Sequence, residues 1–171
     1  MLDLFLIRHA KSELINHSGE DLNRDLSDLG IEKTKIIGEH IFEQKFTIEE
    51  ILCSPALRTK KTLEIILDFL VKPPKIRVID DLYYASGKTI YETVVKEAKK
   101  KSTMVISHDP LLSQSIEDFS SDNRDKNYIN AREKFPTSSL FYIKFKVKKW
   151  SEISKINSRI ISFTRPKDLM D

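Results

Sequence analysis

The stretch Leu2-Asp-Leu-Phe-Leu-Ile-Arg8-His9 is a short apolar run that ends abruptly in two chemically versatile polar side chains. An apolar run of this length, bounded by charge, is typical of a buried strand. Similar runs cover residues 48–53, 75–79 and 103–107. Since helical patterns separate these runs, the sequence predicts βαβ units in a three-layer α/β/α sandwich with a mainly parallel sheet.

Helix signals lie between the predicted strands. Ser27 is a suitable N-cap for a helix that runs to about residue 41. Ser54-Pro55 resembles an N-cap followed by proline at the first helical position, and Pro73-Pro74 ends that second helix. A third helix is expected over 88–100, and Asp109-Pro110 repeats the cap-then-proline signal for a fourth.

The end of the chain has a different pattern. Residues 140–147 alternate apolar and basic side chains, and 159–163 form another β-prone run. We expect a final strand pair that forms an antiparallel edge, with the lysines of 144–149 on the outward side of an edge strand. The polar stretch 120–127 is predicted to be a surface loop.

Length and composition limit the function classes. A chain of 171 residues indicates one domain, 1–171, and 29 Lys and Arg against 26 Asp and Glu leave a net charge of only +3. This surplus does not indicate a nucleic-acid or membrane partner. Four glycines are too few for a G-x-G-x-x-G turn or a Walker-type loop, so a phosphate site would have to use side chains.

The single cysteine, Cys53, excludes an intrachain disulfide and every multi-cysteine metal pattern, and it favours a reducing compartment. The N-terminal apolar stretch breaks at Arg8, too early for a signal peptide, and no segment has the ~20 apolar residues of a membrane span. We therefore expect a cytoplasmic protein with no metal and no cofactor.

Polar side chains follow three of the predicted strands. Arg8-His9 closes the first, His108 follows the strand 103–107, and Arg58 lies in the first turn of the helix after the strand that ends at Cys53. Ligands of open α/β sheets bind at the carboxyl ends of the strands, so these groups are expected to share one rim. Arginine binds phosphate through a planar fork, and neutral imidazole can accept a phosphoryl group.

A single Arg-His pair after a strand is more often a surface pair than a catalytic site, but three such placements on one rim favour an anion pocket with a nucleophilic histidine. The other two histidines fit structural roles better. His17 lies in a polar segment and His40 on a predicted helix face, and neither has a partner histidine at metal-ligand spacing.

These residues also carry a family resemblance. The segment 6–12, L-I-R-H-A-K-S, resembles the R-H-G/A signature of the histidine phosphatase superfamily, 53–59 (C-S-P-A-L-R-T) resembles its S-P-x-x-R motif, and 107–110 (S-H-D-P) resembles the third motif. Four further segments are similar to the compact, SixA-like phosphohistidine phosphatase branch: 24–27, 82–85, 135–137 and 150–166. The resemblance covers nearly the whole chain and implies a phosphoglycerate mutase-like fold.

The resemblance implies a metal-independent phosphatase. His9 would attack phosphorus in line and form a phosphohistidine intermediate that water hydrolyses. Arg8, Arg58 and His108 would hold the phosphoryl oxygens and neutralise developing charge in place of a metal ion. The expected partner is a phosphohistidine protein or a small phosphorylated substrate.

Three further residues have weaker roles in this scheme. The resemblance places Ser12 on the phosphate and Arg24 at the substrate mouth. Larger members of the superfamily carry a carboxylic acid that protonates the leaving group, and Asp80 and Asp81 are the nearest candidates by position. Asp81 is kept as a substrate-binding candidate, although both residues could equally cap the turn before Leu82.

Three alternatives remain open from the sequence. A small-molecule phosphomonoesterase or phosphomutase would share the fold, but mutases typically have glycine and glutamate where this chain has Ala10 and Lys11. A non-catalytic module that binds phosphorylated partners would not require His9. A nucleic-acid role is suggested only by the lysine runs.

Overall fold

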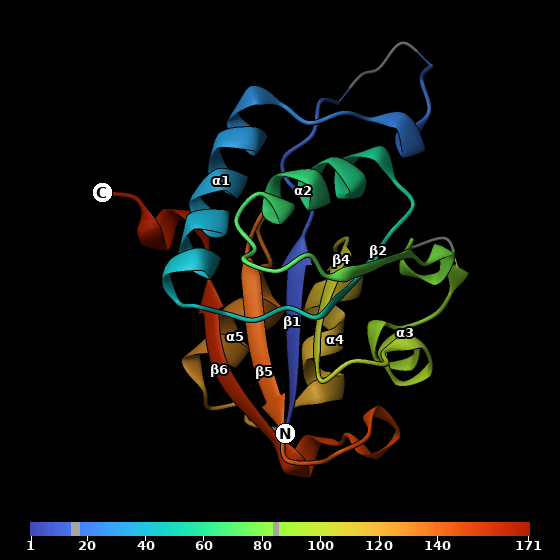
Figure 1. Cartoon of the computed structure of the whole chain (residues 1–171), viewed down its shortest axis with the longest axis vertical. Helices are drawn as coiled ribbons and strands as arrows, with labels where there is room; N and C mark the ends of the chain where they lie inside the picture. The colour runs from blue at the N-terminus through green and yellow to red at the C-terminus, as the bar shows by residue number, and fades with distance from the viewer. Residues whose placement is uncertain (15–17, 84–85) are drawn as a thin grey trace.

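The computed structural model describes residues 1–14, 18–83 and 86–171 and contains a six-stranded mixed sheet (Figure 1). The strands are β1 (Leu2–Arg8), β2 (Glu50–Cys53), β3 (Lys75–Val78), β4 (Ser102–Ser107), β5 (Leu140–Phe145) and β6 (Ser158–Thr164). Their order across the sheet is β3-β2-β4-β1-β5-β6. All six lie at the predicted places.

Five helices cover the sheet. They are α1 (Asp28–Glu43), α2 (Leu57–Leu67), α3 (Ile90–Glu97), α4 (Leu111–Phe119) and α5 (Lys126–Glu133). Short 3-10 turns cover Asp21–Asn23, Asp80–Leu82, Trp150–Glu152, Lys155–Asn157 and Pro166–Leu169. Apolar side chains of α1 and α2 pack on one face of the sheet, and those of α3, α4 and α5 pack on the other (Figure 1). The predicted three-layer sandwich is confirmed.

Strand direction also agrees with the prediction. Four neighbouring strands are parallel to one another: β3, β2, β4 and β1. Strand β5 runs antiparallel to both of its neighbours, β1 and β6. The parallel strands β1 and β4 are neighbours, yet the chain leaves β1 toward α1 on one face and leaves β4 toward α4 on the other. A crevice for ligands opens where neighbouring strands diverge in this way.

The segment after β1 is held against the start of α1. Ser27 caps the helix as predicted, since its hydroxyl accepts a hydrogen bond from the Gly30 amide at 3.0 Å. The Ser27 amide in turn donates to the Lys11 carbonyl at 2.9 Å. At Gly30 the two segments come so close that a Cβ atom would lie 2.2 Å from the Lys11 carbonyl oxygen, so this position requires glycine.

The exposure of the strands differs from the sequence expectation in two places. The predicted strand 75–79 was grouped with the buried ones, but β3 is an edge strand, and Ile76 and Val78 are exposed. The lysine-bearing strand β5 was expected at the edge, but it lies between β1 and β6. Its Lys144 pairs with Asp3 at 3.5 Å. The chain adds β6 outside β5, a pairing that alternation alone could not locate.

Three helix expectations need correction. The second helix begins at Leu57 with Ala56 as its N-cap, so Ser54 does not cap it. The third covers only Ile90–Glu97, with Thr89 and Glu92 forming a capping box. The expected surface loop 120–127 runs into α5, which Asp125 caps through the Asn127 amide. The sequence of α5 is mostly polar and has little helical periodicity.

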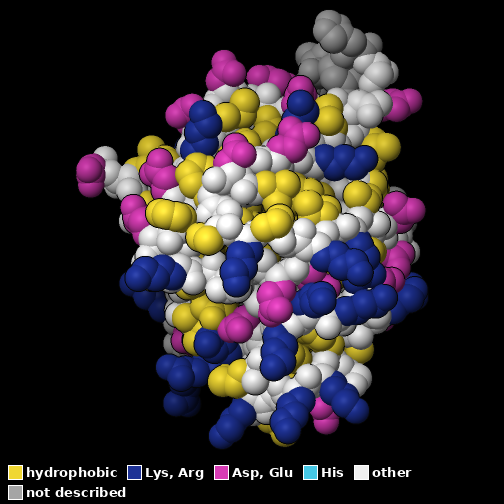
Figure 2. Space-filling model, in the orientation of Figure 1, with side chains coloured by type: hydrophobic (Ala, Val, Ile, Leu, Met, Phe, Trp, Pro, Cys, Tyr) yellow, Lys and Arg dark blue, Asp and Glu magenta, His cyan; other side chains and the backbone are white. Residues whose placement is uncertain are grey.

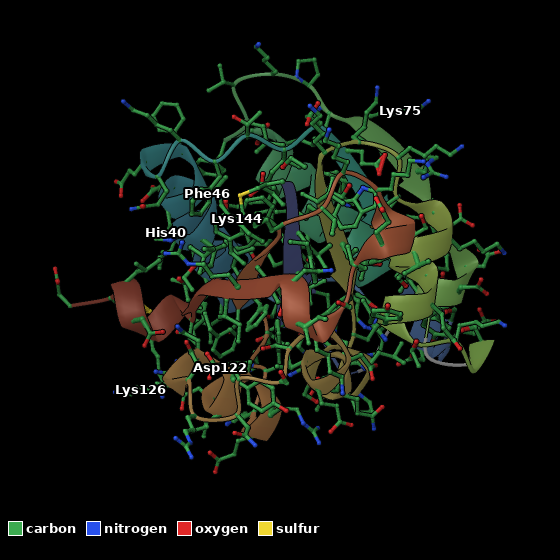
Figure 3. All side chains as sticks on the ribbon, turned by 90° about the horizontal axis from the view of Figure 1, so that it is seen from below. His40, Phe46, Lys75, Asp122, Lys126 and Lys144 are labelled. Carbon is green, nitrogen blue, oxygen red and sulfur yellow. The ribbon has the colours of Figure 1, made fainter. Side chains whose placement is uncertain are left out.

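The surface carries its charge unevenly. Figure 2 shows Lys and Arg side chains gathered toward the end of the molecule where the N-terminus lies, opposite the carboxyl ends of the parallel strands. Figure 3 views this end and shows His40 near Phe46, and their ring centroids are 6.0 Å apart. His40 is thus a packing residue on α1, as predicted, whereas His17 lies outside the described residues. In the described part of the chain, no helix is long and apolar enough to span a membrane.

Candidate active site

The carboxyl ends of β1 and β4 bring the first and third motifs together. Arg8 is the last residue of β1 and pairs in register with Ser107, the last residue of β4. The His9 amide donates to the Ser107 carbonyl at 3.1 Å, which extends the ladder by one residue. The rings of His9 and His108 consequently lie 5.2 Å apart between centroids. The predicted rim is therefore present in the fold.

His9 is held in a defined tautomer by its own backbone. Its Nδ1 lies 2.7 Å from the carbonyl oxygen of Ala10, and a carbonyl can only accept a hydrogen bond. Nδ1 must then carry the hydrogen, so in the neutral ring the lone pair is on Nε2. The Ala10 amide donates to the Thr62 hydroxyl at 2.8 Å, which fixes this turn against α2.

The surroundings keep the imidazole of His9 neutral. Burial lowers the pKa of His9 to about 3 against the partly compensating hydrogen bond to Ala10. The nearby guanidinium charges of Arg8, Arg58 and Arg24 lower this pKa further. At neutral pH the ring is therefore an uncharged base with a free lone pair, the form that a nucleophile requires.

His108 is oriented by a residue of the second motif. Its Nε2 lies 2.6 Å from the Ser54 hydroxyl, and both residues are fully buried. Burial lowers the pKa of His108 to about 3, and the charge of Arg58 and the charge that His9 would carry if protonated act in the same direction. Tyr83 lies edge-on to this ring, with centroids 5.3 Å apart.

One nitrogen of the Arg8 guanidinium is hydrogen bonded to the backbone, whereas another is a buried donor. Its Nη1 donates to the Phe135 carbonyl at 2.9 Å. Its Nε is buried with no hydrogen-bond acceptor in the part of the chain that the structure describes. A buried donor without an acceptor is costly, and an oxygen of a bound anion would relieve that cost.

Arg58 enters the site from the first turn of α2, and only 2% of the side chain is exposed. Its Nη1 donates to the backbone carbonyl of Asp21 at 2.8 Å, and its Nη2 lies 3.0 Å from Oδ2 of the same residue. The charge of Arg58 lowers the pKa of both His9 and His108. Arg58 thus belongs to the same charged cluster, with Asp21 as an additional acidic member.

The weaker candidates Ser12 and Arg24 meet at the edge of this cluster. Arg24 Nη2 donates to the Ser12 hydroxyl at 2.8 Å, and Arg24 Nη1 pairs with Asp21 Oδ1 at 3.0 Å. Ser12 forms an isolated β-bridge with Leu26, which holds the two segments side by side. The charge of Arg24 reaches His9, as its effect on the pKa of His9 shows.

Asp81 is less closely connected. It lies in the 3-10 turn Asp80–Leu82, which follows β3, and its backbone carbonyl accepts a hydrogen bond from the Ser86 hydroxyl at 2.9 Å. Among the described residues, no hydrogen bond or ion pair links its carboxylate to the cluster. Its role in substrate binding stays a prediction.

Three members of the cluster were not singled out from the sequence: Ser54, Asp21 and Tyr83. The only signal for Ser54 was its place in the second motif, where it was interpreted as a helix cap. Asp21 and Tyr83 meet each other through a hydrogen bond from the Tyr83 hydroxyl to Asp21 Oδ2, across 62 positions of sequence. Contacts of this range carry no local sequence signal.

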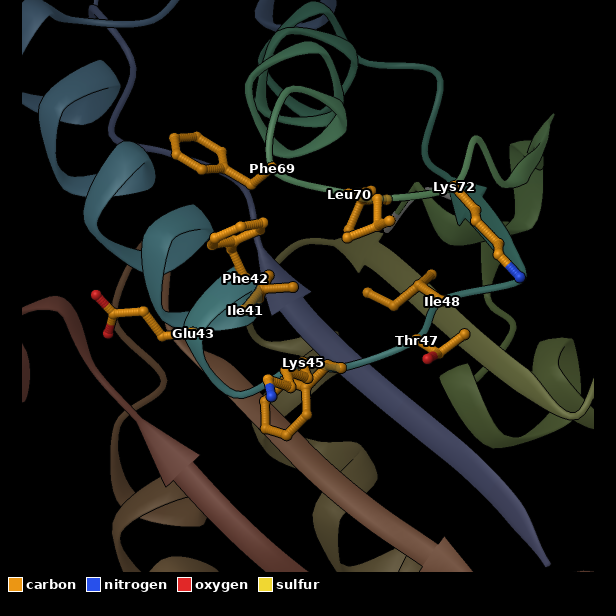
Figure 4. A pocket seen from close by; sticks show the side chains of 11 residues that line it. Ile41, Phe42, Glu43, Lys45, Thr47, Ile48, Phe69, Leu70 and Lys72 are labelled. Atoms are coloured by element: carbon orange, nitrogen blue, oxygen red, sulfur yellow. The ribbon is translucent and has the colours of Figure 1, made fainter.

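A hollow lies elsewhere on the molecule, away from the charged cluster. It has a volume of about 590 Å3 and is formed where the end of α1 faces the segment after α2 (Figure 4). Its walls are mostly apolar and include Ile41, Phe42, Phe69 and Leu70, with Lys45 and Lys72 at the sides. None of the predicted site residues lines it, so it is separate from the charged cluster.

Comparison with known proteins explains the cluster. Residues 4–82, which contain the first two motifs, match the model of the histidine phosphatase superfamily (branch 1). This part of the chain is therefore similar to that superfamily. His108 and the third motif lie beyond the matched residues, and the pairing of β1 with β4 brings them to the first motif.

The chain is also similar to two individual proteins. The chain is 27% identical to the phosphohistidine phosphatase SixA of Escherichia coli K12 over 118 aligned residues. The aligned region covers 67% of this chain and 72% of SixA. It is 26% identical over 172 residues to an uncharacterized protein of Mycobacterium leprae, covering 94% of this chain and all of the relative.

The fold is shared with a solved member of the same group. The structure of the protein histidine phosphatase SixA complexed with tungstate superimposes with a TM-score of 0.77 at 24% identity, covering 98% of this chain and 99% of that one. At this identity the likeness establishes the fold. The predicted phosphoglycerate mutase-like α/β architecture is thereby confirmed.

Proposed function

We propose that this protein is a phosphatase that works through a phosphohistidine intermediate on His9. The observation that carries the proposal is the tautomer of His9: its Nδ1 hydrogen is held by the Ala10 carbonyl at 2.7 Å, which leaves the lone pair on Nε2. Since burial keeps the pKa of this ring at about 3, the lone pair is available at neutral pH. The similarity of residues 4–82 to the histidine phosphatase superfamily supports the same role.

The first step would transfer the phosphoryl group to the enzyme. Nε2 of His9 forms the new bond to phosphorus, and the bond to the leaving group breaks with its electron pair staying on the leaving atom. Arg8, with its buried Nε donor, and Arg58 would hold the phosphoryl oxygens together with His108. Their fixed donors and charges stabilise the negative charge on those oxygens.

The second step would restore the enzyme. A water molecule attacks phosphorus, the bond from phosphorus to Nε2 breaks, and its electron pair returns to the His9 ring. The attacking water releases one proton to the surrounding solvent, and inorganic phosphate leaves. No step requires a group that this chain does not itself supply, apart from substrate and water.

We further propose that the substrate is a phosphohistidine protein. SixA of Escherichia coli, a phosphohistidine phosphatase by name, is a relative of this chain. An imidazole leaves more easily than an alkoxide, so such a substrate places less demand on a general acid. This argument fits a site whose acid candidates Asp80 and Asp81 follow β3 in a separate 3-10 turn.

A comparison of three substrates tests the proposal. Values of kcat/KM should be measured side by side for a phosphohistidine peptide, an aryl phosphate and 3-phosphoglycerate. We expect the phosphohistidine peptide to be the best substrate and 3-phosphoglycerate the poorest. A clear preference for 3-phosphoglycerate would favour a small-molecule phosphatase or mutase, and inactivity on all three would overturn the assignment as a phosphatase.

A further inference from the structure

Among the described residues, the cluster contains three guanidinium cations and two carboxylates, those of Asp21 and Asp109, and the charge of Asp109 raises the pKa of Arg8. Arg58 and Arg24 both pair with Asp21 at 3.0 Å, through Nη2 and Nη1 respectively. Arg8 lies close enough for the charge of Arg58 to lower its pKa. With both histidines neutral, the three cations offset by two carboxylates leave a net charge of about +1, which favours a phosphoryl anion.

Asp21 is built into this arrangement by hydrogen bonds to its carboxylate and to its backbone carbonyl. Its Oδ1 accepts from Arg24, its Oδ2 accepts from Arg58 and from the Tyr83 hydroxyl, and its carbonyl oxygen accepts from Arg58 Nη1. The Asp21 side chain is 39% exposed, whereas Arg58 behind it is 2% exposed. The carboxylate therefore lies between the buried clamp and the solvent from which a substrate enters.

We propose that Asp21 is a specificity-determining residue that selects the charge of the group attached to the phosphoryl. This inference rests on the proposed phosphatase activity. Asp21 disfavours substrates that carry a second anionic group beside the phosphoryl, and it favours leaving groups that are neutral or cationic. Among natural phosphoryl carriers, the imidazole ring of phosphohistidine has this chemistry, whereas 3-phosphoglycerate carries a carboxylate.

The physical basis for rejection is repulsion in a partly desolvated site. A substrate carboxylate at the mouth would face the Asp21 carboxylate, and like charges a few ångströms apart repel strongly where water is partly excluded. The arginines cannot compensate fully, because Arg58 and Arg24 already donate to Asp21. Without Asp21 the same pocket would have an additional unit of positive charge and would attract a second anionic group.

The basis for preference is a hydrogen bond that a carboxylate can accept. A phosphorylated imidazole that is protonated on its other nitrogen presents an N–H and a positive charge. When the bond from phosphorus to nitrogen breaks, its electron pair stays on the ring, and the protonated ring leaves as neutral imidazole. A carboxylate at the mouth stabilises this protonated form and so increases the fraction of substrate that is ready to react.

Ratios of kcat/KM separate this role from simple support of Arg58. The variants are Asp21→Asn and the control Asp25→Asn, which removes a negative charge from an exposed residue of the same segment. If Asp21 only positions Arg58, its loss will lower kcat/KM for all substrates by one factor. If Asp21 selects charge, the ratio of kcat/KM for 3-phosphoglycerate to kcat/KM for aryl phosphate will rise by about tenfold in Asp21→Asn.

We expect Asp21→Asn also to lower the ratio of kcat/KM for phosphoimidazole to kcat/KM for aryl phosphate. Asp25→Asn should keep both ratios at their wild-type values. Asp21→Glu, which retains the carboxylate, should also have the wild-type ratios. Ratios for Asp21→Asn within twofold of the wild type would overturn the inference and leave the phosphatase assignment intact. Inactivity of the wild-type protein on all three substrates would overturn the assignment itself, and this inference with it.

Discussion

The hydroxyl of Ser54 fixes the orientation of a catalytic candidate. Ser54 and His108 are fully buried and their side-chain atoms lie 2.6 Å apart, so neither group can exchange this partner for water. Removing one partner of a buried hydrogen bond costs about 1–3 kcal/mol, because the other is left unsatisfied. The same contact decides which edge of His108 faces the phosphoryl site.

We therefore predict that Ser54→Ala lowers both stability and activity. The free energy of unfolding should fall by about 1–3 kcal/mol. The value of kcat/KM should fall by roughly tenfold or more, because His108 would no longer be held toward the transferring group. Urea unfolding and steady-state kinetics measure the two effects.

Ser115→Ala is the matched control for Ser54→Ala. Ser115 is also buried, and its hydroxyl donates to the Leu112 carbonyl within α4, away from the cluster. This variant should lose stability but keep kcat/KM. Equal activity of the two variants would show that Ser54 has no part in orienting His108.

At the level of secondary structure, the start of α1 and the segment that follows His9 act as one unit. At Gly30 the helix α1 contacts the backbone of Lys11, and the β-bridge between Ser12 and Leu26 joins the same two segments. Arg24 and Ser12, which hydrogen bond to each other at the edge of the charged cluster, lie in the two segments that this contact joins. A change at Gly30 should therefore be felt at the active site.

Gly30→Ala tests this coupling. Alanine has the better helix propensity by about 1 kcal/mol, but its Cβ would lie 2.2 Å from a backbone oxygen. Overpacking of a rigid contact costs about 1–3 kcal/mol, so we predict net destabilisation and a lower kcat/KM. Lys35→Ala on the exposed side of α1 should change stability by only about 0.5 kcal/mol. A Gly30→Ala protein as stable as the wild type would contradict the close approach.

The elements also show how far sequence reasoning reached. All six strands, the rim and the placement of Arg8, His9, Arg58 and His108 followed from apolar runs and the residues after them. Helix α5 was missed because its sequence is mostly polar. Ser54 was assigned to a helix cap because a hydroxyl can serve a backbone amide or a histidine, and only the pairing of β2 with β4 places it beside His108.

Asp21 illustrates the remaining limit. It lies in a polar segment with no periodicity, and its partners Arg58 and Tyr83 are 37 and 62 positions away. Nothing in the local sequence indicates that its carboxylate enters the cluster. The motifs located the cations of the site, whereas the fold was needed to locate the carboxylate of Asp21.

For the whole molecule, the site makes folding dependent on pH. The pKa values of His9 and His108 are about 3 in the folded protein, below the ordinary histidine value of 6.5. Between these values the unfolded chain binds protons that the folded protein does not. The contribution of the two neutral histidines to stability is thus fully present above about pH 6.5 and is lost as the pH falls toward 3.

We predict that replacing His9 with Asn reduces this pH dependence. Between pH 6.5 and 5, where most carboxylates stay ionised, each such histidine contributes a slope of up to about 1.4 kcal/mol per pH unit. The variant should therefore lose less stability than the wild type over this interval. Urea midpoints at several pH values measure the difference. Parallel curves for the two proteins would show that His9 is not buried as a neutral base.

The central claim is that Nε2 of His9 becomes covalently phosphorylated during turnover. The direct measurement mixes the protein with a phosphohistidine peptide, quenches the reaction within one turnover and locates the phosphoryl group by mass spectrometry at neutral pH. We predict an acid-labile phosphoryl group on His9 in the wild type, with neither that group nor turnover in His9→Ala. Phosphorylation of a different residue, or turnover by His9→Ala, would contradict the account.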